Sequence, residues 1–256
     1  MPEPALIAHV IDNWPGLYEL LDFVVTPAIG DPSERGKWDF FFACNVPREY
    51  FGLRPGCQPG DIDVLVVPVR DGKLVAERAA AVEVKRLALK GPNWTKSVDR
   101  YGIRQATGLL AAGFPYVGLL HIVVSLDGPE EFHRPITYAR IVDPLTGRYE
   151  VLGEGQEDLT SFFAAERQYR RLFAQEIDER IGINCVAIAE TEKLGEPEWA
   201  YTTFTPGRRA IRNPRASKLL IENIQTLTEF WQETSQLRTA DQRKLTRRDK
   251  YYSRVD

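Results

Sequence analysis

The order of apolar and turn-forming segments in this 256-residue chain predicts an α/β fold with a mixed sheet. An amphipathic segment near the amino terminus precedes three apolar runs of strand length, and a second helical segment then leads into a fourth apolar run. Hydrophobic types make up 43% of the residues, which is enough to build a substantial core. We therefore expect an αβββαβ core.

Local signals give the elements of this core. Apolar residues at helical spacing follow Pro15, and a loop is expected from Pro27. Asp71-Gly72 lies between two apolar runs and is typical of a hairpin turn, and Gly113 is expected to end the second helix. The expected helices are 17–25 and 98–112, and the expected strands are 38–46, 61–69, 76–89 and 116–126.

The second half of the chain has a different character. Residues 127–155 are expected to be rich in loops, with one short strand at 136–142. Two long amphipathic helices and two strands are expected after it, at 158–181, 217–237, 183–192 and 198–205. We assign residues 1–126 to the core and 127–256 to a C-terminal α+β elaboration packed on it, ending in a basic segment.

Composition excludes several classes of protein. No apolar run is long enough to span a bilayer, and no secretory signal is evident, so a cytoplasmic, non-membrane protein is expected. Cys44, Cys57 and Cys185 are too scattered for a disulfide framework or a zinc knuckle, and His121 lies in an apolar run typical of a core strand. Net charge is −3, but residues 205–256 carry 12 Lys/Arg against 6 Asp/Glu, an asymmetry found on nucleic-acid-binding faces and on solvated helices alike.

Two carboxylates in apolar strands are the strongest chemical signal. Asp63 and Glu83 would each be costly in such a strand unless paired or bound to a cation. Lys85 shares a face with Glu83 by the two-residue strand period, and the hairpin would bring Asp63 beside both. Oxygen ligands of this kind suit Mg²⁺ or Mn²⁺. A simple ion pair between Glu83 and Lys85 on an exposed strand is the alternative.

These residues resemble a known family. Gly60-Asp61-Ile62-Asp63, then Glu83-Val84-Lys85, then Gln105 in a helix, resemble the PD-(D/E)XK superfamily of restriction-endonuclease-like nucleases. The resemblance covers about the first half of the chain, including its expected αβββαβ order. It implies catalytic roles for Asp63, Glu83, Lys85 and Gln105, and metal ligation by Asp63, Glu83 and the Val84 carbonyl.

The match departs from the family pattern in one place. The literal Pro-Asp is replaced by Gly60-Asp61-Ile62-Asp63, so Asp61 is an alternative to Asp63 as the ligand. Many members add an acid from the first helix, for which Glu19 is the candidate. Lys85 is expected at an exposed strand end, contributing little to stability, and removal of Asp63 is expected to relieve repulsion between the carboxylates. Basic residues that could contact nucleic acid are Lys90, Lys96, Arg104, Arg208, Arg209 and Arg212.

The function expected from these observations is Mg²⁺-dependent hydrolysis of nucleic acid, by a DNA endonuclease of restriction, defence or repair. A catalytically silent module of the same fold, which binds nucleic acid or protein, is the alternative. A third possibility is an interaction protein whose long C-terminal helices pair with a partner. A homodimer or a larger defence complex remains open in each case.

Overall fold

A computed structural model gives the conformation of most of the chain. It describes residues 17–30, 37–53, 59–89, 102–125, 133–143, 146, 148–158, 160–193, 196–202, 207–234 and 245–247, and the structural statements below concern these residues.

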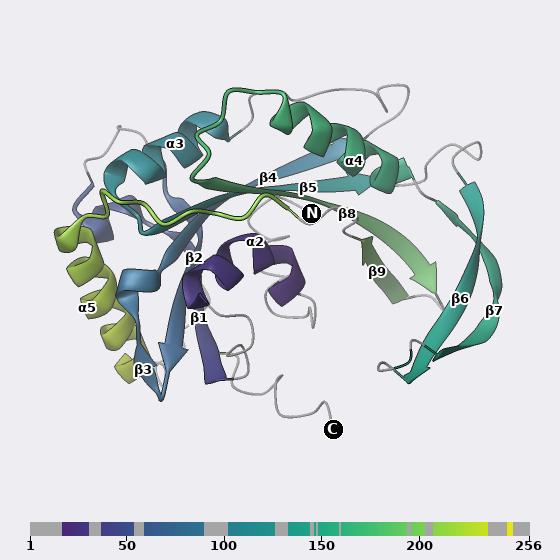
Figure 1. The fold of residues 1–256 in the computed structure, drawn as a ribbon, viewed down its shortest axis with the longest axis horizontal. Coiled ribbons are helices and arrows are strands. Elements are labelled where there is room, and N and C mark those ends of the chain that lie inside the picture. The colour runs from purple at the N-terminus through teal and green to yellow at the C-terminus, as the bar shows by residue number, and fades with distance from the viewer. Residues whose placement is uncertain are drawn as a thin grey trace.

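The chain forms an α/β structure around one large mixed sheet with the strand order β10-β1-β2-β4-β5-β8-β9 (Figure 1). The β4–β5 and β5–β8 pairs are parallel and the other pairs are antiparallel. The strands are β1 Trp38–Val46, β2 Ile62–Arg70, β3 Lys73–Leu74, β4 Ala80–Leu89, β5 Tyr116–Ser125, β6 His133–Asp143, β7 Arg148–Asp158, β8 Ile181–Lys193, β9 Glu196–Thr202 and β10 Leu245–Arg247.

Helices cover both faces of this sheet. Helix α2 (Leu17–Ile29) packs on one face, whereas α3 (Ile103–Ala112) and α4 (Thr160–Phe173) pack on the other (Figure 1). Helix α5 (Lys218–Thr234) contributes Leu220 and Ile224 to the same hydrophobic cluster as α3. Because both faces are covered, β4 and β5 are nearly continuous apolar runs, which makes a buried carboxylate in β4 conspicuous.

The first half has the predicted order of helix, three main strands, helix and strand. The parallel β4–β5 pair joined through α3 is confirmed, as is the hairpin turn at Asp71-Gly72, where both residues have positive φ. The predicted strand 76–89 is too long, however. The hairpin leads only into the short β3, and a 3-10 turn (Ala76–Arg78) then offsets the chain before β4 starts at Ala80.

Two helix limits also differ from prediction. Helix α2 continues through Pro27 to Ile29. A proline inside a helix leaves a carbonyl four residues earlier without its usual donor. Here the Phe23 carbonyl accepts a hydrogen bond from the Ala210 N–H at 2.7 Å, so a distant segment compensates for the proline. The predicted helix 98–112 cannot run through Gly102, which has φ +78°.

The second half extends the same sheet. Strand β8 pairs with β5, and β9 pairs with β8, so residues beyond 126 complete the sheet of the first half. Helix α4 ends at Phe173 rather than at 181. Beyond it Asp178 accepts hydrogen bonds from the backbone and side chain of Arg180, which forms a turn before β8 begins.

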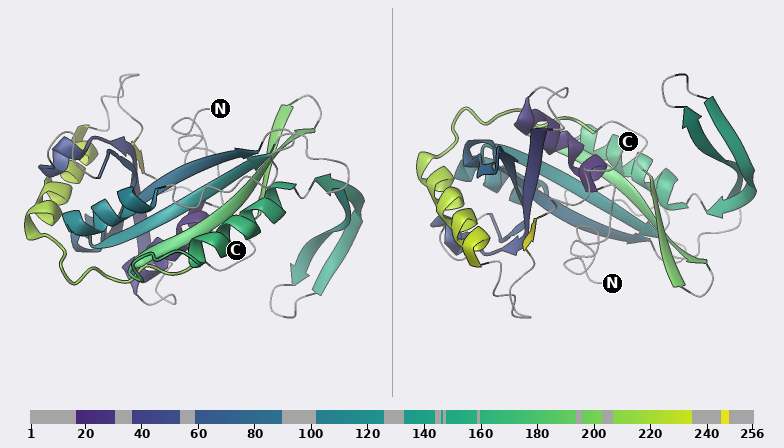
Figure 2. Two further views of the ribbon diagram at one scale, coloured as in Figure 1. Left: turned by 90° about the horizontal axis from the view of Figure 1, so that it is seen from above. Right: turned by 90° about the horizontal axis from the view of Figure 1, so that it is seen from below.

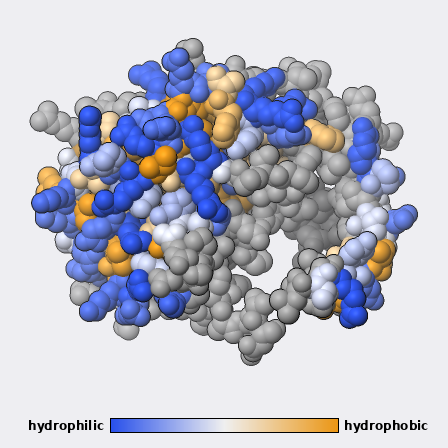
Figure 3. Space-filling model, in the orientation of Figure 1, coloured by the Kyte–Doolittle hydropathy of each residue, from blue (hydrophilic) through white to orange (hydrophobic). Residues whose placement is uncertain are grey.

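The prediction of a loop-rich segment at 127–155 is wrong. Strands β6 and β7 form a two-stranded hairpin that stands apart from the main sheet in both views of Figure 2. Where its side chains are described, the hairpin is largely exposed, and its exposed residues include the apolar Val142, Tyr149, Val151 and Leu152. On the body of the molecule, hydrophilic side chains predominate over the face shown in Figure 3. Within the described part of the chain, every helix is too short or too polar to cross a bilayer.

Candidate functional site

Asp63 lies where the antiparallel β2–β4 ladder ends. The register pairs Val64 with Val82 and Leu65 with Ala81, so its continuation places Asp63 opposite Glu83, on the same face of the sheet. The ladder does not continue through this pair. Instead, Asp63 Oδ2 accepts a hydrogen bond from the Val84 N–H at 2.7 Å. The carboxylate thus takes the place of a backbone partner and is fixed beside β4.

Glu83 and Lys85 complete the cluster. Glu83 is buried, with only 1% of its side chain exposed, and its Oε1 lies 2.6 Å from Lys85 Nζ. The same ammonium lies 3.8 Å from Asp63 Oδ2. One lysine therefore contacts two carboxyl groups, so the cluster holds one more acidic group than basic groups. The expectation of an exposed Lys85 is wrong, because only 12% of its side chain is exposed to solvent.

Gly102 explains why this part of β4 is covered. It caps the amino end of α3 in a left-handed conformation. A Cβ at Gly102 would lie 2.8 Å from Leu119 Cδ1 and 3.1 Å from the Cγ atoms of Glu83 and Lys85. The helix therefore begins directly over the two charged side chains of β4, at a distance that only glycine allows.

We expect Gly102→Ala to destabilise the protein more than Gly72→Ala. Both glycines have similar positive φ, +78° and +74°, so alanine costs roughly 1–2 kcal/mol at either position. Gly72 has open space around it, whereas Gly102 is crowded, which adds roughly 1–3 kcal/mol. Denaturant unfolding of the two variants measures the difference. Equal losses of stability would show that α3 does not press on the β4 side chains.

The remaining residues of the predicted site, Gln105, Asp61 and Glu19, differ in how close they lie to the Asp63–Glu83–Lys85 cluster. Gln105, in the first turn of α3, has its Nε2 3.3 Å from the position of a Cβ on Gly60, the residue that precedes Asp61. Asp61 itself is exposed and accepts a 3.4 Å hydrogen bond from the Arg48 N–H, which favours Asp63 over Asp61 as the inward-facing acid. Glu19 lies on α2, which covers the opposite face of the sheet, and its side chain lies outside the described residues.

The predicted nucleic-acid contacts are dispersed. Lys90 and Lys96 lie outside the described residues, and Arg104 is exposed in the first turn of α3, two residues after Gly102. Arg209 and Arg212 are exposed, on a segment that crosses the amino-terminal ends of β5 and β8. Arg104 is thus two residues from Gly102, which lies against Glu83 and Lys85, whereas the segment with Arg209 and Arg212 bridges to β8, two strands away from β4.

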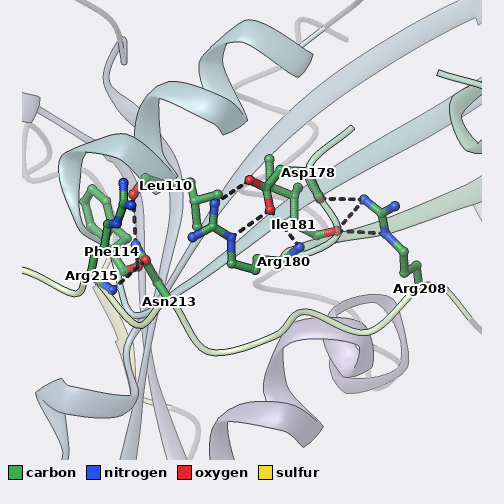
Figure 4. Close-up of polar contacts among 8 residues, drawn as sticks. All are labelled: Leu110, Phe114, Asp178, Arg180, Ile181, Arg208, Asn213 and Arg215. Carbon is green, nitrogen blue, oxygen red and sulfur yellow. Dashed lines mark hydrogen bonds and ion pairs between the residues drawn. The ribbon is translucent and has the colours of Figure 1, made fainter. Parts of the chain in front are cut away.

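Arg208 has a structural role. Its guanidinium donates hydrogen bonds to the carbonyls of Asp178 and Ile181, as Figure 4 shows. Burial lowers the pKa of this guanidinium, although nearby Asp178 opposes the shift. In the same segment Asn213 donates to the carbonyls of Leu110 and Phe114 at the end of α3 (Figure 4). These contacts fasten the segment to the fold and commit Arg208 to backbone carbonyls.

The donor set fits a hard divalent cation. Asp63 and Glu83 offer carboxylate oxygens, and the Val84 carbonyl lies between Glu83 and Lys85 in the chain; Mg²⁺ combines few protein oxygens with several waters. Among the described residues, no group of three or more His, Cys, Asp or Glu side chains is placed to hold a metal ion. A cation at this site would therefore rest on two carboxylates, a backbone oxygen and water.

Sequence reasoning missed a polar pair beside the site. The β4–β5 register places His121 next to Lys85. His121 is fully buried, and its Nδ1 lies 3.2 Å from Nε2 of Gln168 on α4. The signal that could have found it is the equal spacing of Lys85 and His121 from the starts of two parallel strands.

Comparisons with family models, with curated proteins and with solved structures find no match to this chain.

Proposed function

We propose that this chain is a Mg²⁺- or Mn²⁺-dependent nuclease that hydrolyses phosphodiester bonds in DNA, built on the plan of the PD-(D/E)XK superfamily. One observation carries the proposal: Lys85 Nζ lies 2.6 Å from a buried Glu83 oxygen and 3.8 Å from an Asp63 oxygen. Two carboxylates and an ammonium on one face, at the start of a helix, form a set suited to phosphate chemistry.

The residues have distinct roles in this proposal. Asp63, Glu83 and the Val84 carbonyl would hold the cation. When bound, Mg²⁺ would lower the pKa of a water and neutralise charge on the scissile phosphate. Lys85 would donate hydrogen bonds to the attacking water or to a phosphate oxygen, stabilising the charge that develops as the water oxygen bonds to phosphorus and the leaving oxygen departs. Gln105, near Gly60, would help to position the phosphate.

The topology supports this assignment independently of the motif. The order α2, β1, β2, β4, α3, β5 has the helix–three strands–helix–strand arrangement of that superfamily, apart from the short β3. The acid pair lies where antiparallel β2 and β4 diverge, and α3 starts over it. A same-face ion pair on an exposed strand would not require a buried glutamate, since exposed pairs contribute little. The preference for DNA over RNA comes from the family resemblance.

The proposal is tested by a cleavage assay. Purified protein with Mg²⁺ or Mn²⁺ is expected to nick or degrade plasmid and linear DNA, and EDTA is expected to abolish the activity. Labelled single-stranded DNA, duplex DNA and RNA of one sequence establish the substrate class. Metal-independent binding without cleavage of any of these would contradict the nuclease proposal and support a binding module.

A further inference from the structure

We infer that His121 and Gln168 form a buried positioning pair that holds Lys85 against the two carboxylates. The inference deepens the proposed function, because it assigns a support to its central lysine. It begins from burial: His121 is fully buried and Gln168 is 3% exposed, although both side chains are polar. Buried polar groups are costly unless their hydrogen bonds are made. The 3.2 Å contact between Gln168 Nε2 and His121 Nδ1 makes one such bond across the β5–α4 interface.

The register relates this pair to the site. Lys85 pairs with His121 on one side of β5, and His121 pairs with Cys185 on the other. Side chains paired across parallel strands share a face, and neighbouring strands are about 4.8 Å apart. Their shared face is the one that α3 and α4 cover, because Cys185 belongs to the same core cluster as Leu109 and Leu172. His121 is therefore the nearest residue to Lys85 on the adjacent strand β5, on the same face of the sheet.

The direction of the lysine shows what this neighbour does. In the order β2-β4-β5, Asp63 lies on one side of Lys85 and His121 on the other. The ammonium lies toward Asp63 and Glu83. Gly102 closes over the Lys85 stem, since a Cβ there would be 3.1 Å from Lys85 Cγ. The register places His121, whose imidazole is held by Gln168, on the β5 side of Lys85. Lys85 is thus confined to the position in which its ammonium reaches both carboxylates.

The test compares His121→Ala and Gln168→Leu with Cys185→Ala. Cys185 pairs with His121 on the next strand and is also buried, and burial raises the pKa of its thiol, which disfavours the thiolate. Its truncation opens space in the same layer, but one strand further from Lys85. We expect His121→Ala to lower kcat by about ten-fold or more with KM changed less than about two-fold, because misplacement of a catalytic group acts on the transition state. Gln168→Leu is expected to act in the same direction, and Cys185→Ala to leave both constants unchanged.

A second readout does not depend on activity. Acetylation of lysines by a dilute acylating reagent, followed by mass spectrometry, reports the access to Lys85 relative to exposed Lys73. His121→Ala is expected to raise this ratio several-fold, and Cys185→Ala to leave it unchanged. An unchanged ratio and kcat in His121→Ala, or equal effects of His121→Ala and Cys185→Ala, would overturn the inference. If the wild type cleaves no nucleic acid, the proposed function fails, and the acetylation ratio still decides whether the pair positions Lys85.

Discussion

Lys85→Met is expected to abolish most cleavage and, in the absence of metal, to destabilise the fold. The loss of a charged donor at a phosphoryl-transfer site lowers kcat by about a hundred- to a thousand-fold. The loss of stability follows from burial, because Glu83 is 1% exposed and would lose the ammonium that lies 2.6 Å from its Oε1. Breaking a buried ion pair from one side costs roughly 3–5 kcal/mol. Steady-state cleavage rates and urea unfolding measure the two effects.

The double variant Glu83→Gln/Lys85→Met separates the effects. It replaces both charges, so it is expected to recover much of the stability lost in Lys85→Met while remaining inactive. Added Mg²⁺ is expected to stabilise Lys85→Met, because a bound cation would replace the missing ammonium as the counter-charge. Equal cleavage by wild type and Lys85→Met would point to a contaminating nuclease and would favour the catalytically silent binding module over the nuclease.

Asp63→Asn is expected to remove both metal binding and cleavage while leaving the fold intact. The amide oxygen can still accept the hydrogen bond that Asp63 Oδ2 accepts from the Val84 N–H at 2.7 Å. It lacks the negative charge that a hard cation needs, so Mn²⁺ affinity is expected to fall by at least about a hundred-fold. Calorimetric titration with Mn²⁺ measures this affinity. Asp61→Asn is the matched control, because Asp61 lies two residues before Asp63. Loss of affinity in Asp61→Asn alone would transfer the ligand role to Asp61.

Asp63→Ala is informative by contrast. The sequence suggests that removing Asp63 relieves repulsion between two carboxylates. The structure gives the opposite expectation, because alanine would leave the Val84 N–H without its 2.7 Å acceptor and Lys85 with one carboxylate fewer. A lost acceptor for a partly buried donor costs roughly 1–3 kcal/mol. Asp63→Ala is thus expected to unfold at lower urea concentration than Asp63→Asn.

The charged residues of the site could be predicted because they interrupt apolar strands. Asp63, Glu83 and Lys85 stand out against their neighbours, and the two-residue period places the last two on one face. Their burial could not be predicted, since it depends on Gly102 beginning α3 directly over them. That arrangement arises between a strand and a helix start that are not adjacent in sequence.

Other features of the fold could not be predicted from local sequence, because they depend on contacts with distant parts of the chain. Helix α2 passes through Pro27 because the Ala210 N–H satisfies the Phe23 carbonyl, a contact between residues far apart in sequence. Strand β7 has the sequence RYEVLGEGQED, in which apolar residues are few and do not alternate, so the two-residue period that identifies strands was weak there. The pair of His121 and Gln168 depended on the β5 register and on the placement of α4, neither of which a local pattern contains.

The most direct measurement of the central claim is the anomalous scattering of Mn²⁺ in crystals soaked with that ion. We predict a peak between the carboxylates of Asp63 and Glu83, close to the Val84 carbonyl, that is absent from Asp63→Asn crystals soaked in the same way. No peak at these residues in the wild-type protein, with the Lys85 ammonium still between the two carboxylates, would contradict the assignment of a metal-dependent active site.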